Sequence, residues 1–418
     1  MESKSLSQER KEIIDVDEFL DRYHYISSLD LKLILNLDFE LDYYYKSEKI
    51  CPIIELAKPE DAKEIVGIFK EIYRGTYPYK QMEDINSIRK MIIHPNYHWF
   101  IFKLNSKEIV GCFGADLDLH EKRAFLHGFN IKKQYQKTTD IFKAFIGCII
   151  YLWREYRDKI FLWYGEMRTN EAISQFFTSL IGMKPIAFLP NKDIFFNKIE
   201  SDVLHIIFNK AILKQYRFKE KPKLIRQVLN CYSYTNKRYN LNLPLIENPK
   251  ITLSQKDIKL IRSSVSVEIK EDTFGNQEVK FLIKKTSSFF EFFHNIYSKN
   301  IENTKYKIQS LEELFVFIEK VKTFIDSMNI NYFECYVSAY LPEHQKIFND
   351  AGFKPRGYIP CWRFHKSENY FEDQIIFNSF NGSIDENIKL IPEAIDLIQI
   401  LKPSKDNRIS DLLKIKKF

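Results

Sequence analysis

Apolar side chains recur every three to four positions between residues 141 and 153, which predicts a long helix with a buried face. The preceding segment Ala124–Ile131 is aromatic and β-branched, as is typical of a buried strand, and Gly128 inside it indicates a bulge. The loop between strand and helix is polar and basic. Thr138, Thr139 or Asp140 is expected to cap the helix. Unpaired N–H groups at such a helix start are a natural seat for an anion.

The same periodicity predicts the order β, α, α, β, β, β, α, β, α, β, β across residues 51 to 210. Before it, residues 29 to 43 alternate between apolar and polar positions, which predicts a half-buried strand or a hairpin turning near Asn36. The expected strands cover 51–57, 98–104, 108–117, 124–131, 159–167, 185–189 and 203–208, and the expected helices begin at Pro59 and cover 83–93, 140–156 and 170–180.

An internal repeat is the most specific pattern in the chain. Residues 161–190 align without a gap with residues 331–360, which places Gln175 opposite Gln345 and Gly182 opposite Gly352. Each block is predicted as strand, helix, glycine stop and strand, so the chain carries two copies of one supersecondary unit. The second copy extends back to a hairpin around Gly275–Asn276, with a helix over 311–324. A further helix is expected over 224–228, and one or two closing helices after residue 392.

The segment Arg123–Tyr156 resembles motif A of the GNAT superfamily, the acyl-CoA-dependent N-acyltransferases. In that family a bulged strand leads into a loop of pattern Gln/Arg-x-x-Gly-x-Gly/Ala, which here falls on residues 136–141. Gln136 matches, whereas Thr139 and Ile141 stand at the glycine positions. The repeated blocks resemble motif B of the same family. The loop before Leu311 in the second copy is too short for the cofactor, and the residues after it are acidic.

This resemblance implies an α/β fold of two GNAT-like domains, each a mixed, mostly antiparallel sheet flanked by helices. The expected boundaries are 1–50 for an N-terminal extension, 51–210 for the acyl-CoA-binding copy and 211–418 for the degenerate copy. The implied activity is transfer of an acetyl group from acetyl-CoA to an amine of a small molecule or protein, without a metal. The residues implied to bind acetyl-CoA are Phe129, Ile131, Gln136, Lys137, Thr138, Thr139, Asp140 and Asn170.

Three residues are candidates for the chemistry. Glu166 ends the motif B strand, where central strands separate in this family, and could take a proton from the amine; a solvated strand end is the alternative. His127 lies beside the predicted bulge and has a suitable intrinsic pKa, although it could equally be a packed core histidine. The family's usual acid, a tyrosine on the motif B helix, is replaced by Phe177 or Thr178. Tyr164 is therefore the candidate acid.

The resemblance places Tyr77 and Tyr79 where the acceptor site is walled, and they could instead pack for structure. Asp116 and Asp118 are acceptor candidates near a turn that could also be simply solvated. Asn170 could act as a helix N-cap rather than bind the cofactor. Two further functions stay open. One is a catalytically inactive GNAT-derived module that binds CoA or another ligand, and the other is a structural interaction protein.

Composition narrows the partners. The 418 residues are 45% hydrophobic and 28% charged, with a net charge of +7 and scattered lysines, which does not indicate a nucleic-acid surface. No run reaches the ~20 apolar residues of a membrane span, and the N-terminus lacks a signal-peptide core. The six cysteines show no zinc-site spacing. A cytoplasmic protein with reduced thiols and no metal is expected, of open oligomeric state.

Overall fold

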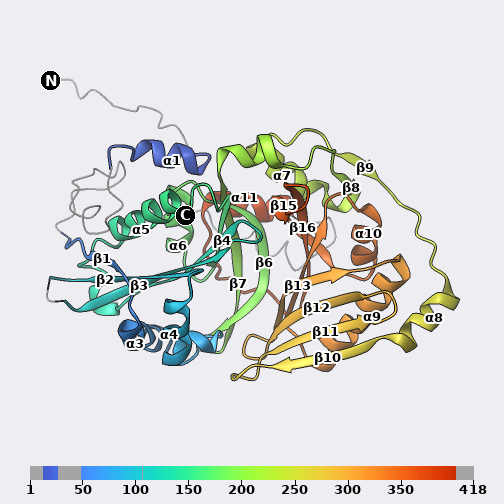
Figure 1. Ribbon diagram of the computed structural model, residues 1–418, viewed down its shortest axis with the longest axis horizontal. Helices are drawn as coiled ribbons and strands as arrows, with labels where there is room; N and C mark the ends of the chain where they lie inside the picture. Colours follow the sequence, from blue (N-terminus) through green and yellow to red (C-terminus); the bar gives the residue numbers. More distant parts are fainter. Residues whose placement is uncertain (1–12, 27–48, 106, 402–418) are drawn as a thin grey trace.

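The computed structural model describes residues 13–26, 49–105 and 107–401. The alternating segment 29–43 lies outside these residues. Fourteen strands form one sheet in the order β1-β2-β3-β4-β5-β7-β6-β15-β16-β14-β13-β12-β11-β10 (Figure 1). Their bounds are β1 Ile53–Leu56, β2 Tyr97–Lys103, β3 Ile109–Asp118, β4 Arg123–Ile131, β5 Leu162–Arg168, β6 Lys184–Phe195, β7 Lys198–Phe208, β10 Ser266–Glu271, β11 Gln277–Ile283, β12 Ser288–Asn295, β13 Asn300–Lys307, β14 Tyr332–Ser338, β15 Lys354–His365 and β16 Tyr370–Phe380.

Helices cover this sheet, so the predicted α/β class with a mostly antiparallel sheet is confirmed. The order predicted for residues 51–210 is also observed. The helices of that half are α3 (Ala62–Tyr73), α4 (Ile85–Ile93), α5 (Ile141–Glu155) and α6 (Ile173–Leu180). Helix α5 buries Trp153 and its neighbours against one face, where α1 (Val16–Arg22) adds Phe19 at 4.7 Å from the Trp153 ring. Helices α3 and α4 form a separate apolar cluster with Trp99 and Ile101.

The two halves of the sheet have the same strand order. β1-β2-β3-β4-β5-β7-β6 is matched from the other edge by β10-β11-β12-β13-β14-β16-β15. The irregularities recur as well, because register shifts in β6 and β15 surround Asn191 and Cys361, which have φ of 58° and 55°. Gln175 and Gln345 donate to the backbone carbonyls at the ends of β5 and β14, at 3.2 and 3.0 Å. The 170-residue repeat therefore has a structural counterpart, while the domain boundaries stay a prediction.

One layer distinguishes the halves. In the N-terminal half α3 and α4 connect β1 to β2, whereas residues 272–276 make a tight turn between β10 and β11. In the second half, α9 (Leu311–Ser327) and α10 (Pro342–Asp350) pack against one face of the sheet. Their side chains Phe317 and Phe348 are buried in this contact. Among the described residues, no helices lie between β10 and β11 in the way that α3 and α4 lie between β1 and β2. The opposite face of β11 to β13 therefore lacks that helix layer.

Three local predictions were wrong. Residues 224 and 225 belong to strand β8 (Lys223–Ile225), paired in parallel with β9 (Leu245–Glu247), because the Lys223 N–H donates to the Ala339 carbonyl and the Ile225 N–H donates to the Gln345 side-chain oxygen. The rest of the predicted helix, Arg226–Val228, is a 3₁₀ turn that leads into α7 (Leu229–Tyr239). Strands β6 and β7 extend well beyond the predicted ends. They meet in a hairpin whose turn has Phe196 and Asn197 at positive φ, and a phenylalanine there gives no turn signal. Helix α6 begins at Ile173, so Asn170 is not its N-cap.

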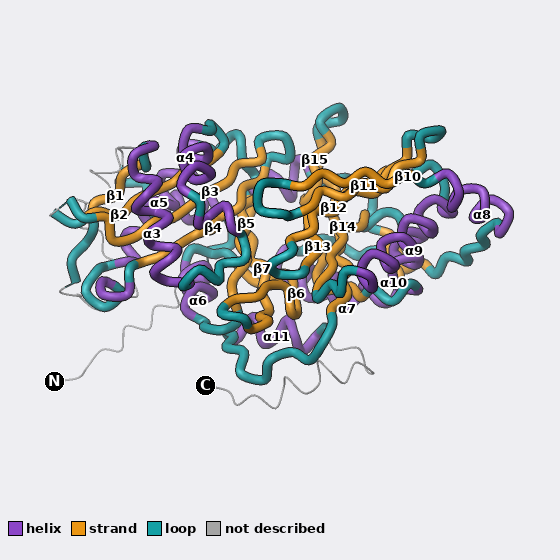
Figure 2. Tube along the Cα trace, turned by 90° about the horizontal axis from the view of Figure 1, so that it is seen from below, coloured by secondary structure: helices purple, strands orange, loops and turns teal. Residues whose placement is uncertain are grey.

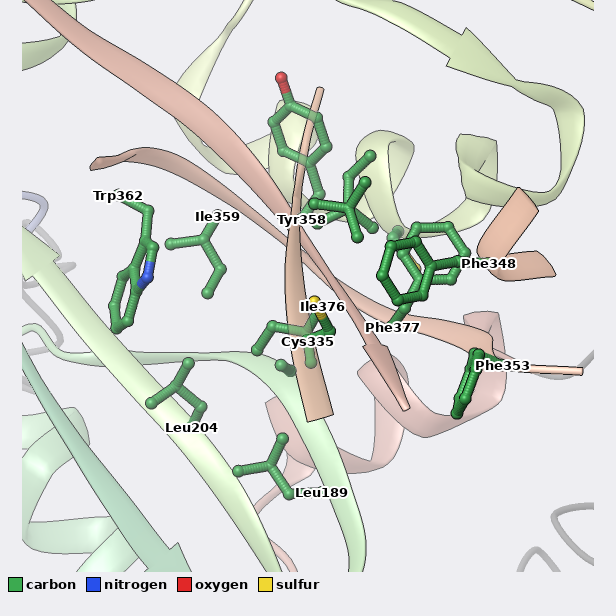
Figure 3. Packing of buried hydrophobic residues seen from close by; sticks show 14 of the residues in the cluster. Leu189, Leu204, Cys335, Phe348, Phe353, Tyr358, Ile359, Trp362, Ile376 and Phe377 are labelled. Carbon is green, nitrogen blue, oxygen red and sulfur yellow. The ribbon is translucent and has the colours of Figure 1, made fainter. Parts of the chain in front are cut away.

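The halves join edge to edge through β6 and β15, with Gly357 opposite Ala187. Figure 3 shows Leu189 and Leu204 of the first half beside Cys335 and Ile376 of the second, all in one apolar cluster. Helices α7 (Leu229–Tyr239) and α11 (Pro392–Ile400) contact β15 and β6 at this joint. Figure 2 shows α11 on the opposite side of the sheet from α4.

Gly357→Ala should weaken this joint. A Cβ at position 357 would lie 2.3 Å from the Ala187 Cβ and 2.8 Å from the Ile186 carbonyl oxygen, so a strand must move. We expect a loss of about 1–3 kcal/mol in unfolding free energy, measured by urea denaturation. Gly67→Ala in α3 is the control, because its Cβ meets nothing within 4 Å and helix propensity favours alanine. Equal stability of the Gly357 variant and the wild type would contradict the steric argument.

Candidate functional site

Strands β4 and β5 run in parallel but pair over only three residues each, ending at Phe125 opposite Tyr164. Beyond this point β4 continues to Ile131 paired with β3 alone. The bulge expected near Gly128 is present, since its φ is +63° and the β3–β4 register shifts there. The two strands therefore separate at the level of His127 and Glu166, as the resemblance implied.

Aromatic rings line one face of the sheet across this separation and across the joint of the two halves. Phe125, His127, Tyr164 and Tyr336 are half-buried residues of this face. The Arg123 guanidinium lies 4.2 Å from the Trp362 ring. Successive ring centroids lie 5.3, 5.4, 5.1, 4.9 and 4.9 Å apart along the row Trp99, His127, Phe125, Tyr164, Trp362 and Tyr336.

A buried ion cluster continues from this aromatic row, two residues further along the strands. The Lys192 ammonium lies 2.6 Å from a carboxylate oxygen of Glu166, 3.6 Å from Glu302 and 3.5 Å from Glu334. Asp193 is held beside it by the Ser298 hydroxyl at 2.7 Å. The carboxylates come from β5, β6, β7, β13 and β14, with Asp202 of β7 interacting electrostatically with Asp193, so both halves of the sheet build the cluster. We call Lys192, Glu166, Asp193, Asp202, Glu302 and Glu334 the junction cluster.

Negative groups outnumber the ammonium in the junction cluster, and their burial forces some of them to hold protons. Burial raises the pKa of Glu302 to about 8 and that of Asp193 to about 6, despite the nearby ammonium. It also raises the pKa of Glu334 and, with the Asp193 carboxylate, that of Asp202. One oxygen of Asp202 has no hydrogen-bond partner among the described residues. Burial opposes the charge of Lys192, but the surrounding carboxylates hold its pKa well above the usual value.

Of the four residues predicted to bind the acceptor, Tyr79 contacts the junction cluster and the other three lie elsewhere. The Tyr79 hydroxyl donates to Glu302 at 3.2 Å, so the α3–α4 connection reaches the cluster. Tyr77 packs against the Phe69 and Phe195 rings. Asp116 lies opposite Phe125 on the aromatic face. Asp118 instead accepts hydrogen bonds from the backbone of the following turn and shapes that turn.

The other two catalytic candidates lie in the aromatic row. His127 is packed between Trp99 and Phe125, and burial lowers its pKa to about 4, so the ring is neutral at pH 7. Its Nδ1 atom is buried without a partner in the described part of the chain. Burial raises the pKa of Tyr164, which keeps this phenol protonated and able to donate. Glu166 is thus the candidate base that the structure brings to the junction cluster.

The loop predicted to hold a pyrophosphate uses its own donors. The N–H groups of Thr138 and Thr139 donate to the Tyr135 carbonyl, and that of Asp140 donates to Ile50 at 2.8 Å. The Asp140 carboxylate caps α5 by accepting from Lys143 at 3.1 Å. Backbone donors at these positions therefore do not fit a phosphate group in this conformation. The exposed residues between β4 and α5 are Lys133, Gln134, Gln136, Lys137 and Thr138.

The corresponding helix start in the second half is closed in the same way. The Glu313 carboxylate accepts from the N–H groups of Gln309 at 2.7 Å and Ser310 at 3.3 Å, and from the Ser288 hydroxyl at 2.7 Å. Burial opposes its ionisation, but these hydrogen bonds lower the pKa of Glu313. An internal carboxylate thus takes the donors that an anion would need.

Sequence reasoning missed most of the junction cluster. Lys192 and Asp193 follow a predicted strand as an ordinary charged pair, and Glu302 lies more than 100 residues away. Their one sequence signal is Glu334, which the repeat aligns with Tyr164, so a carboxylate in one copy stands where the other copy has a tyrosine. Their meeting depends on the edge-to-edge joint of the half-sheets.

Within the described ranges, no three His, Cys, Asp or Glu side chains gather in a way suited to a metal ion. None of the described helices is long and apolar enough to cross a membrane.

No family model and no curated protein matches this sequence. Among solved structures, a variant of the spermidine N-acetyltransferase SpeG from Vibrio cholerae is similar, with a TM-score of 0.33 and 11% identity over 38% of this chain and 94% of that chain. A probable acetyltransferase from Staphylococcus epidermidis has a TM-score of 0.31 and 16% identity, over 37% of this chain and 97% of that chain. Similarity at this level carries no argument about the activity of this chain.

Glu302→Gln should change how stability depends on pH. Because folding raises the Glu302 pKa from 4.5 to about 8, the folded state binds more protons between these values. The unfolding free energy of the wild type should therefore fall, relative to the variant, as pH rises through this window. The slope is at most about 1.4 kcal/mol per pH unit. The groups that face Glu302 are Lys192, Glu166, Asp193, Glu334 and Tyr79.

Denaturant unfolding at a series of pH values measures this difference. Glu291→Gln is the control, because Glu291 forms a pair with Lys280 at 2.8 Å in which both side chains are about one third solvent-accessible, and pairs near the surface contribute little. The raised pKa of Glu302 is contradicted if the unfolding free energies of the variant and the wild type change in parallel with pH. It is also contradicted if the variant loses stability relative to the wild type as pH rises.

Proposed function

We propose that this chain is an N-acyltransferase that moves an acetyl group from acetyl-CoA to an amine. The observation that carries the proposal is the junction cluster, placed where the parallel strands β4 and β5 separate. An amine acceptor arrives as an ammonium ion, and a buried site with excess carboxylates attracts it. Tyr164 and Tyr336, which are half-buried on the same face, would add cation–π contacts for such a group.

Glu166 is the group that we assign to proton removal. Its side chain is 17% exposed, compared with 10% for Glu302 and 4% for Glu334, so an acceptor or a bridging water reaches it first. The ammonium ion first gives one proton to Glu166, and the neutral nitrogen then bonds to the acyl carbon. As the carbon–sulfur bond of the thioester breaks, the nitrogen gives its second proton to water and the sulfur takes up a proton. Tyr164, neutral because of its raised pKa, is the candidate donor to the departing sulfur.

Acetyl-CoA supplies an acyl group already activated as a thioester. Phe129 and Ile131 lie on the part of β4 that leaves β5 and are the strand residues that would lie along the donor. The N–H groups of Thr138, Thr139 and Asp140 are taken, so the exposed side chains of Gln136 and Lys137 are the ones that would bind its phosphates. The Gln136 amide already donates to the Ile131 carbonyl at 3.1 Å and would bind a phosphate with its second N–H.

We also propose that the chain is a tandem arrangement of two GNAT-like units, residues 51–210 and 211–418, after an N-terminal extension of residues 1–50. The matching strand orders support this division. In this proposal the second unit is not a second active site, because Glu313 closes its helix start. Its contribution is Glu302 and Glu334 at the junction cluster.

A second candidate function is a cytoplasmic, catalytically inactive module of the same origin that binds CoA or another ligand. The observation that favours it is the closed loop before α5, where Tyr135 and Ile50 accept the N–H groups expected to hold a pyrophosphate. The two candidates differ in turnover, which the experiments below measure.

Lys137→Glu should weaken binding of acetyl-CoA about tenfold or more, because a charge-assisted bond to phosphate is worth roughly 1.5–3 kcal/mol. Isothermal titration calorimetry of the full chain provides the dissociation constant. Lys346→Glu on α10 is the matched control, a surface lysine of the second half that should leave the constant unchanged. If both variants bind as the wild type does, the phosphate site lies elsewhere, and if the wild type does not bind acetyl-CoA, the acyl-CoA proposal fails.

Glu166→Gln should lower kcat by roughly 10², the usual contribution of a positioned base, and leave acetyl-CoA affinity nearly intact. Thiol release with a panel of amines gives the rates, and calorimetry gives the affinity. His127→Gln is the discriminating variant, because the His127 ring is buried and neutral. Full activity of the Glu166 variant with loss in the His127 variant would assign the base to His127. Binding of acetyl-CoA by the wild type with no turnover on any amine would favour the inactive module.

A further inference from the structure

Strand β10 is the outermost strand of the second half-sheet, and no described strand pairs with its outer side (Figure 1). Its residues are exposed on both faces, with Val267 51% and Ile269 54% accessible. The opposite edge strand, β1, is different, because Ile54 is fully buried and α5 contacts it. An open edge with apolar side chains is a template for pairing with another strand.

The hairpin geometry determines which backbone groups of β10 point outward. The Asp272 N–H donates to the Asn276 carbonyl, so these two residues form a hydrogen-bonded pair. Hydrogen-bonded and non-hydrogen-bonded pairs alternate along an antiparallel ladder. Residues 270, 268 and 266 therefore bond inward to β11, and Val267, Ile269 and Glu271 direct their N–H and C=O groups outward.

Two rows of the hydrophobic core end at this edge. Phe292 on β12 lies opposite Val279 on β11, which lies opposite Ile269. Phe292 and Val279 are 3% and 1% exposed, so burial stops abruptly at β10. The parallel row through Phe281 ends in the same way at Val267. The sheet thus presents an unfinished core at its edge.

A ladder of alternating charges crosses the other face to the same edge. Lys305 lies opposite Glu291, Glu291 opposite Lys280 and Lys280 opposite Glu268. The Lys280 ammonium is 2.8 Å from the Glu291 carboxylate. Continuation of the alternation beyond Glu268 requires a positive residue on the next strand.

A second copy of this chain supplies that residue. When two copies of β10 pair antiparallel about a twofold axis at Ile269, Glu268 of each faces Lys270 of the other. The same register places outward-bonding residues opposite each other and joins the two Ile269 side chains. Registers centred on residue 268 or 270 also pair outward-bonding residues, but they place Glu268 against Glu268 or Lys270 against Lys270 at the axis. We propose that the protein forms a homodimer through antiparallel β10–β10 pairing in the register centred on Ile269.

Charge reversal at two positions tests this register. Lys270→Glu creates two pairs of negative charges across the interface, because the new carboxylate of each copy faces Glu268 of the other. Glu268→Lys likewise creates two pairs of positive charges with Lys270. Each variant should therefore weaken the dimer about tenfold or more. An equimolar mixture of the two variants should dimerise again, because every cross-strand pair is then of opposite charge. The double variant, with both charges exchanged, should also regain the dimer. Sedimentation velocity of the full chain over a concentration series measures these states.

Ile269→Pro provides a test of the backbone. It removes an outward N–H at the centre of the interface without removing a hydrogen bond to β11, and should abolish dimerisation while thermal unfolding shows an intact fold. The proposal is overturned by a wild type that stays monomeric up to millimolar concentration. It is equally overturned by a dimer that the single variants do not weaken, by a variant mixture that does not associate, or by growth into larger assemblies.

Discussion

The rest of the structure depends on one buried ammonium ion. The Lys192 Nζ atom lies among carboxylates from β5, β13 and β14, so a single positive charge holds together strands from both halves of the sheet. An unpaired charge at such a depth would cost several kcal/mol, and removal of one partner from a buried pair typically destabilises a protein by 3–5 kcal/mol. The position of β6 relative to β13 and β14 is therefore coupled to this contact. The joint at Gly357 and Ala187, one residue wide in register, gains its specificity from these polar groups.

The difference between the two halves of the sheet creates the candidate site. In the first half α3 and α4 cover a face of the sheet, and in the second half a tight turn replaces them. The α3–α4 connection of the first half extends toward the second, where the Pro78 carbonyl accepts from Asn295 and Tyr79 donates to Glu302. If the second half also had such helices, they would cover this face in both halves of the sheet. The loss of one layer leaves the aromatic row and the junction cluster between the halves.

Each half of the sheet has an internal carboxylate at a helix start. Asp140 caps α5, and Glu313 takes the donors at the start of α9. A helix N-terminus carries partial positive charge and unsatisfied N–H groups, so an acidic side chain there stabilises the helix without any ligand. Donors at a helix start can thus be satisfied either by a phosphate or by a carboxylate of the chain itself.

The sequence by itself determined the local elements of this protein. Apolar periodicity predicted the order of strands and helices over residues 51–210, and Gly128 marked the bulge in β4, because these features depend on neighbours within a few residues. The gapless repeat anticipated the matching strand orders, since equal side-chain patterns favour equal local folds. Tertiary structure decided the rest. Lys192 and Glu302 meet only because two half-sheets join edge to edge, and residues 224–225 became a strand because distant groups accept and donate their backbone hydrogen bonds. Contacts of this kind depend on pairing between strands more than 100 residues apart, which no local pattern of side chains encodes.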